Sequence, residues 1–116
     1  MNHGLPEGSI LAIRGILAGF PEVEKAVLYG SRAMGNFRRG SDIDLTLMGD
    51  RLNTTLLSRI DWALDDLLLP YKMDLSLFSQ LRHPALLEHI RRVGVPLYER
   101  SLPDDSPLNP VTPSNG

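Results

Sequence analysis

The sequence predicts an α/β domain of the α+β kind, in which helices and short strands alternate along the chain. Stretches with apolar residues at helical spacing alternate with short apolar or in-out stretches typical of strands. The length of 116 residues suits one domain with a modest core. No cysteine is present, so neither disulfides nor thiolate metal sites are expected. The same alternation also allows a doubly wound parallel sheet.

The first elements follow from apolar density and turn residues. Residues 5–19 predict an amphipathic helix, because proline and an acid suit its first turn and glycine follows its last apolar residue. Residues 23–29 are dense in apolar side chains and predict a buried strand. Residues 31–34 predict a short helix, for which Ser31 is a favoured N-cap.

The later elements continue the alternation. Strands are predicted over residues 43–48, 71–78 and 95–98. Helices are predicted over residues 53–69 and 83–93. We place the last strand at a sheet edge, because Pro96 lacks the N–H that a central strand needs. From Ser101 onward the chain is polar and rich in proline, which predicts a domain over residues 1–100 and a disordered tail over 101–116.

Two carboxylates lie within the alternation of the second predicted strand. Asp42 and Asp44 share one face of the strand, while Ile43, Leu45 and Leu47 share the other. Two like charges so close together are unfavourable unless a cation or protons offset their repulsion. The pair therefore predicts a metal site.

A Gly-Ser turn precedes this pair by ten residues. Gly30 can adopt a positive φ, and the helix that follows directs backbone N–H groups and a positive dipole toward its own start. Such a turn between a strand and a helix is suited to phosphate. Asp74 lies inside the third predicted strand, where polar and apolar side chains also alternate between the two faces. If the second and third predicted strands pair, Asp74 can lie close to Asp42 and Asp44.

The stretch GSRAMGNFRRGSDIDL resembles the signature of the DNA polymerase β-type nucleotidyltransferase superfamily. In this fuller form it is similar to the minimal nucleotidyltransferases (MNT), a branch that pairs with HEPN-domain proteins. The resemblance implies the nucleotidyltransferase fold, a short, mixed, twisted sheet with helices mainly on one face. We prefer this fold to the doubly wound sheet.

The resemblance also implies an activity and a set of site residues. Asp42, Asp44 and Asp74 would be catalytic and would bind two Mg²⁺ ions, whose hard character suits carboxylate oxygens. ATP would be the substrate, and AMP would be transferred to a hydroxyl. The nucleotide-binding residues would be Gly30, Ser31, Arg32, Arg38, Arg39 and Ser41.

The acceptor implied by the resemblance lies on another chain, since the motif core leaves little room for a substrate domain. In the MNT branch the partner is a HEPN toxin, and the MNT protein acts as antitoxin by adenylylating a tyrosine. Two other classes stay open. One is a binding subunit that neutralises a partner by complex formation alone or assists a small-molecule nucleotidyltransferase. The other is a structural or regulatory domain that uses the carboxylate pair for a metal only.

Composition argues against several other partners. The formal net charge is −2 with no long basic run, so direct nucleic-acid binding is not expected. No apolar stretch reaches the ~20 residues of a membrane helix, and no signal peptide pattern is present, so we expect a cytoplasmic protein. Asp61 and Asp65 are expected on a solvated helix face, whereas the pattern leaves the role of Trp62 open.

Overall fold

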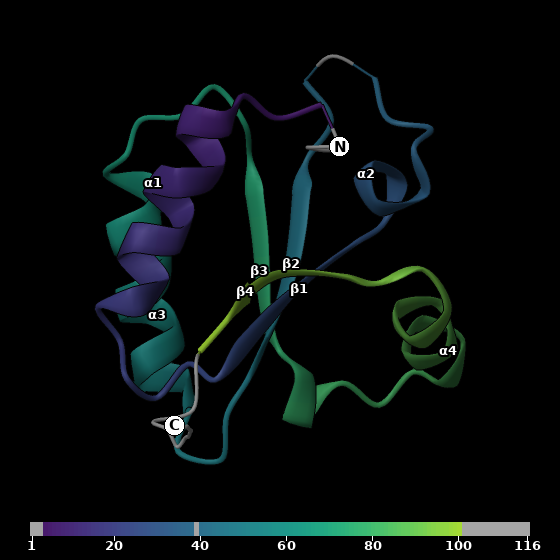
Figure 1. Cartoon of the computed structure of the whole chain (residues 1–116). Coiled ribbons are helices and arrows are strands. Elements are labelled where there is room, and N and C mark those ends of the chain that lie inside the picture. Colours follow the sequence, from purple (N-terminus) through teal and green to yellow (C-terminus); the bar gives the residue numbers. More distant parts are fainter. Residues whose placement is uncertain (1–3, 39, 101–116) are drawn as a thin grey trace, which may run out of the picture.

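The computed structural model describes residues 4–38 and 40–100, and Figure 1 shows the arrangement of its elements. The α-helices are α1 (Glu7–Ala18), α2 (Ser31–Met34), α3 (Thr54–Asp65) and α4 (Pro84–Val93). The strands are β1 (Lys25–Tyr29), β2 (Ile43–Met48), β3 (Met73–Leu77) and β4 (Val95–Glu99). A short 3-10 helix, η1 (Phe78–Gln80), follows β3. The predicted tail and Arg39 lie outside the described residues.

The four strands form one mixed sheet in the order β3-β2-β1-β4. β1 is antiparallel to both β2 and β4, whereas β2 and β3 are parallel. This sheet confirms the predicted fold class and rules out the doubly wound parallel alternative. β4 lies at an edge, as the proline within it requires.

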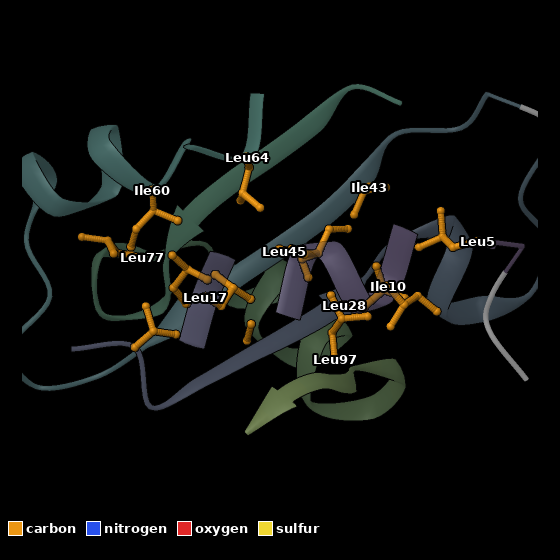
Figure 2. Packing of buried hydrophobic residues seen from close by; sticks show 14 residues of the cluster. Leu5, Ile10, Leu17, Leu28, Ile43, Leu45, Ile60, Leu64, Leu77 and Leu97 are labelled. Carbon is orange, nitrogen blue, oxygen red and sulfur yellow. The ribbon is translucent and has the colours of Figure 1, made fainter. Parts of the chain in front are cut away.

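Helices cover the two faces of the sheet unequally (Figure 1). The two 12-residue helices, α1 and α3, lie together on one face, and α4 lies on the other. The larger core lies under α1 and α3, where Leu17 and Leu64 meet Leu28 and Leu45 of the sheet (Figure 2). A smaller apolar cluster of Val27, Tyr29 and Ile90 lies under α4. The sheet face beneath α4 thus keeps room for polar groups.

Several element boundaries differ from the predictions by one or two residues, and two further differences, at the start of α2 and the end of α3, have a clear backbone cause. The N-cap of α2 is Gly30 rather than Ser31, because the chain enters the helix at φ 78° and ψ −156°, which glycine alone adopts readily. α3 ends at Asp65 rather than at residue 69. Leu68 takes a left-handed φ of 55° and is exposed, so the last leucines before the proline leave the helix.

No helix in the described part of the chain has the length and apolarity needed to cross a membrane.

Candidate active site

The sheet register brings two of the predicted carboxylates together. Asp44 of β2 is the parallel register partner of Asp74 of β3, and it is also the antiparallel partner of Tyr29 of β1. Ile43 and Leu45 are buried in the larger core, so Asp44 lies on the opposite face, toward α4. One row across three strands therefore reads Tyr29, Asp44, Asp74.

Asp42 lies beside this acidic row, at the position just before β2. It is two residues before Asp44, and its negative charge is close enough to act on Asp44. Asp42 and Asp74 are exposed, whereas Asp44 is half-buried. Burial raises the pKa of the Asp44 carboxyl, the charges of Asp74 and Asp42 raise it further, and His89 opposes the shift. A cation placed here would reverse that effect.

The Gly30 turn lies directly against Asp44. A Cβ added to Gly30 would clash with Oδ2 of Asp44, so the carboxylate occupies the space that a side chain would need. The predicted turn and the predicted metal ligand are therefore neighbours. On its other side, the Gly30 N–H donates a hydrogen bond of 3.0 Å to Nε2 of His89 in α4.

Tyr29 is a site residue that the sequence analysis did not include. Its side chain is buried beside the acidic row, and burial raises the pKa of its phenol. The Ser76 hydroxyl opposes this shift in pKa, while the charges of Asp74 and Asp44 add to it. The phenol thus keeps its proton at neutral pH and is available as a donor. Its position directly before Gly30 was the only signal in the sequence.

Arg32 lies inside the protein, with 1% of its surface exposed. Its Nε and Nη2 donate hydrogen bonds of 3.1 and 2.9 Å to the carbonyl oxygen of Ser41. The guanidinium also stands 5.2 Å from the ring centroid of Phe37 and 5.0 Å from that of Tyr71. Arg32 therefore ties α2 to the residue before Asp42. Its predicted phosphate contact stays a prediction.

Arg32→Lys is expected to lower the free energy of unfolding by about 1–3 kcal/mol, measured by chemical denaturation. A lysine cannot reproduce the two guanidinium hydrogen bonds to one carbonyl or the flat contact with two rings. Arg38→Lys is the matched control, because Arg38 is exposed in the loop that follows α2 and its replacement should change stability by less than about 0.5 kcal/mol. Equal effects of the two variants would contradict the structural role of Arg32.

The other predicted nucleotide-binding residues lie at the start of α2 or in the loop between α2 and β2. Ser31 is half-buried at the first position of α2. The Ser41 hydroxyl accepts a hydrogen bond of 2.8 Å from the Arg38 N–H, and the Arg38 side chain is exposed. Arg39 lies outside the described residues, so its predicted role is not placed.

Several residues left aside by the prediction are surface groups. Asp61 and Asp65 are exposed on α3, as expected. Trp62 beside them is 74% exposed. Within residues 4–38 and 40–100, no three or more His, Asp or Glu side chains are arranged so that they could hold a metal ion together.

Comparison with solved structures shows the same fold in toxin–antitoxin proteins. A toxin–antitoxin crystallised with AMP-PNP matches with a TM-score of 0.63 at 22% identity, covering 87% of this chain and 79% of that chain. The complex of tri-AMPylated Shewanella oneidensis HEPN toxin with MNT antitoxin matches with a TM-score of 0.60 at 18% identity. That match covers 81% of this chain and 72% of the other. At such identities the likeness shows the fold alone.

Comparison with curated proteins finds no match. The family model described as "Polymerase beta, Nucleotidyltransferase" matches residues 12–102. This range includes the Gly30 turn, Asp42, Asp44 and Asp74. The chain therefore belongs to the polymerase beta nucleotidyltransferase family.

Proposed function

We propose that this protein transfers AMP from ATP to a tyrosine hydroxyl of a HEPN toxin and so acts as its antitoxin. Asp44 and Asp74 lie side by side on paired strands, Asp42 lies just before β2, and the Gly30 turn contacts Asp44. This arrangement is the observation that carries the proposal. Family membership supports nucleotidyl transfer as the reaction class. An ATP-consuming reaction also favours the cytoplasm as its location.

Mg²⁺ fits the chemistry of this donor set. The carboxylates are hard oxygen donors, and the charges of Asp74 and Asp42 add to the burial that raises the pKa of Asp44. Within the described residues none of these three side chains forms an ion pair with Lys or Arg. Mg²⁺ commonly binds through one or two carboxylates together with substrate phosphates, so a ready group of three protein ligands is not required. We assign Asp42 and Asp44 as ligands of two ions, with Asp74 on the acceptor side. Bound there, Mg²⁺ would supply Lewis acidity to the triphosphate and to the attacking hydroxyl.

The residues of the chain then divide the work between nucleotide and acceptor. Ser31 would hold the β- and γ-phosphates through its backbone N–H and its hydroxyl, with Gly30 shaping the turn before it. Arg38 is exposed in the loop between α2 and β2, so its guanidinium can reach phosphate oxygens. We include Arg39 and Ser41 among the nucleotide-binding residues. The new bond joins the acceptor oxygen to the α-phosphorus, and the bond to the bridging oxygen breaks as pyrophosphate leaves. Asp74, being exposed, would take the proton of the hydroxyl.

We assign the acceptor to a partner protein by likeness to the solved structures that share this fold. The relatives named above are toxin–antitoxin proteins, and one of them contains an AMPylated HEPN toxin. By that likeness we place a HEPN toxin over the exposed carboxylate of Asp74. Modification of the toxin, rather than binding alone, would neutralise it.

Label transfer tests the proposal. The protein is incubated with Mg²⁺, a candidate HEPN partner, and ATP labelled at the α- or the γ-phosphate. Label from α-ATP on the HEPN protein, with none from γ-ATP, is the expected result. A stable, unlabelled complex would instead identify a binding subunit, and an absence of both label and nucleotide binding would leave a domain without transferase function.

Asp74→Asn is expected to lower kcat by about 10- to 100-fold while changing the Kd for ATP less than about threefold. The reason is that Asp74 lies at the exposed acceptor side of the row, away from the Gly30 turn that holds the triphosphate. Steady-state transfer and calorimetric titration measure the two constants. Glu99→Gln on the opposite edge strand is the matched control. A larger effect on ATP affinity than on kcat would move Asp74 out of the acceptor role.

A further inference from the structure

A histidine of the last helix contacts the turn at the candidate active site. His89 of α4 is 59 residues from Gly30 in sequence, yet its Nε2 accepts the Gly30 N–H at 3.0 Å. The imidazole also meets the Tyr29 ring edge-on, with ring centroids 6.3 Å apart and an interplanar angle of 79°. Two consecutive residues at the end of β1 are thus held by one side chain of α4.

This hydrogen bond fixes the place of the turn. Gly30 lies between two groups, the Asp44 carboxylate on the side of its missing Cβ and His89 at its N–H. Gly30 has φ 78° and ψ −156°, and its carbonyl oxygen accepts the Met34 N–H of α2 at 3.1 Å. Helix α2 therefore holds the carbonyl side of the turn, and His89 holds its N–H.

We propose that His89 is a positioning residue for nucleotide binding: it holds the Gly30 turn in the conformation that presents Ser31 to the triphosphate. The inference rests on the proposed function for the identity of the ligand and on the Gly30–His89 hydrogen bond for the role. The helix that carries His89 is otherwise joined to the sheet by the small apolar cluster of Val27, Tyr29 and Ile90. α4 therefore supports the nucleotide turn as well as covering the sheet.

Three variants distinguish the effect of the hydrogen-bond acceptor of His89 from the effect of its aromatic ring. His89→Phe keeps an aromatic ring against Tyr29 but has no acceptor for the Gly30 N–H. His89→Gln keeps an acceptor oxygen at about the same reach. His83→Phe is the matched control, because His83 is the exposed N-cap of α4 and its Nδ1 accepts only the Leu86 N–H, at 3.4 Å.

Titration with Mg²⁺ and α,β-methylene-ATP measures the effect. The Kd is expected to rise about tenfold in His89→Phe and to stay within about threefold of the wild-type value in His89→Gln and His83→Phe. In transfer assays the loss is expected in KM for ATP rather than in kcat, because the turn binds the triphosphate equally in ground and transition states. Thermal unfolding of each variant checks that the fold is intact.

The amide signal of Gly30 in ¹H–¹⁵N NMR spectra reports the contact without any nucleotide. It is expected to move upfield in His89→Phe and to stay in place in His83→Phe. A moved signal with unchanged ATP affinity would overturn the positioning role alone and leave the proposed function standing. An unmoved signal would show that the contact itself is absent. If the wild-type protein binds no ATP while the signal moves, the proposed function fails, and with it the role of His89 toward the triphosphate.

Discussion

Replacing Asp44 with asparagine is expected to lower AMP transfer by about 100- to 1000-fold. Asp44 is half-buried. It lies beside Asp74 of the next strand and two residues after Asp42. An asparagine keeps the size and the position against Gly30 but removes the negative charge that would hold Mg²⁺. Transfer of α-label to the HEPN protein measures the loss.

The same variant should not be less stable without metal. Because the pKa of Asp44 is raised in the folded state, its ionised form costs stability, and this cost appears as the pH rises from the ordinary value of about 3.9. Asp44→Asn should therefore match or exceed the wild-type stability at pH 7, and the difference should vanish below that pH. Denaturation curves at pH 3 and pH 7 test the sign.

Asp61→Asn is the matched control for Asp44→Asn, since it removes the same charge from the exposed face of α3. Its transfer rate should stay within about twofold of the wild-type rate, and its free energy of unfolding within about 0.5 kcal/mol of the wild-type value. Retained transfer in Asp44→Asn, or an equal loss in Asp61→Asn, would remove Asp44 from the proposed metal site.

Gly30→Ala is expected to abolish most transfer, by about 100-fold or more, and to lower the free energy of unfolding by about 1–3 kcal/mol. An alanine is strained at the backbone angles of Gly30, and its Cβ would meet Oδ2 of Asp44. The carboxylate can turn aside, which relieves the clash but moves the proposed metal ligand. Transfer assays and chemical denaturation measure both effects.

Gly35→Ala separates backbone strain from this clash. Gly35 also has a positive φ, 84°, but nothing lies within 4 Å of an added Cβ. It should cost about 1–2 kcal/mol of stability through strain while keeping most transfer. If Gly30→Ala retained as much transfer activity as Gly35→Ala, the contact between the turn and Asp44 would not be needed for activity.

The sequence predicted the faces of the strands better than their pairing. Alternation around Ile43 and Leu45 is enough to place Asp42 and Asp44 away from the core, because apolar residues must point inward. The register that joins Asp44 to Asp74 depends on the parallel pairing of β2 and β3, which no local pattern specifies. The acidic row could therefore be expected only on the condition that those strands pair.

The contacts that complete the site could not be predicted from local patterns. No local pattern shows that Arg32 packs against the rings of Phe37 and Tyr71 and donates to the Ser41 carbonyl, and its phosphate contact stays a prediction. His89 looks like any polar residue of an amphipathic helix, because its partner is 59 residues away. Such long-range contacts are fixed by tertiary packing.

A crystal structure with Mg²⁺ and α,β-methylene-ATP tests the central claim most directly. The account predicts a cation about 2.0–2.1 Å from carboxylate oxygens of Asp42 and Asp44, with the β- and γ-phosphates against Gly30 and Ser31. A cation held instead by the exposed acids Asp61 and Asp65 of α3, or a triphosphate bound away from the Gly30 turn, would contradict it.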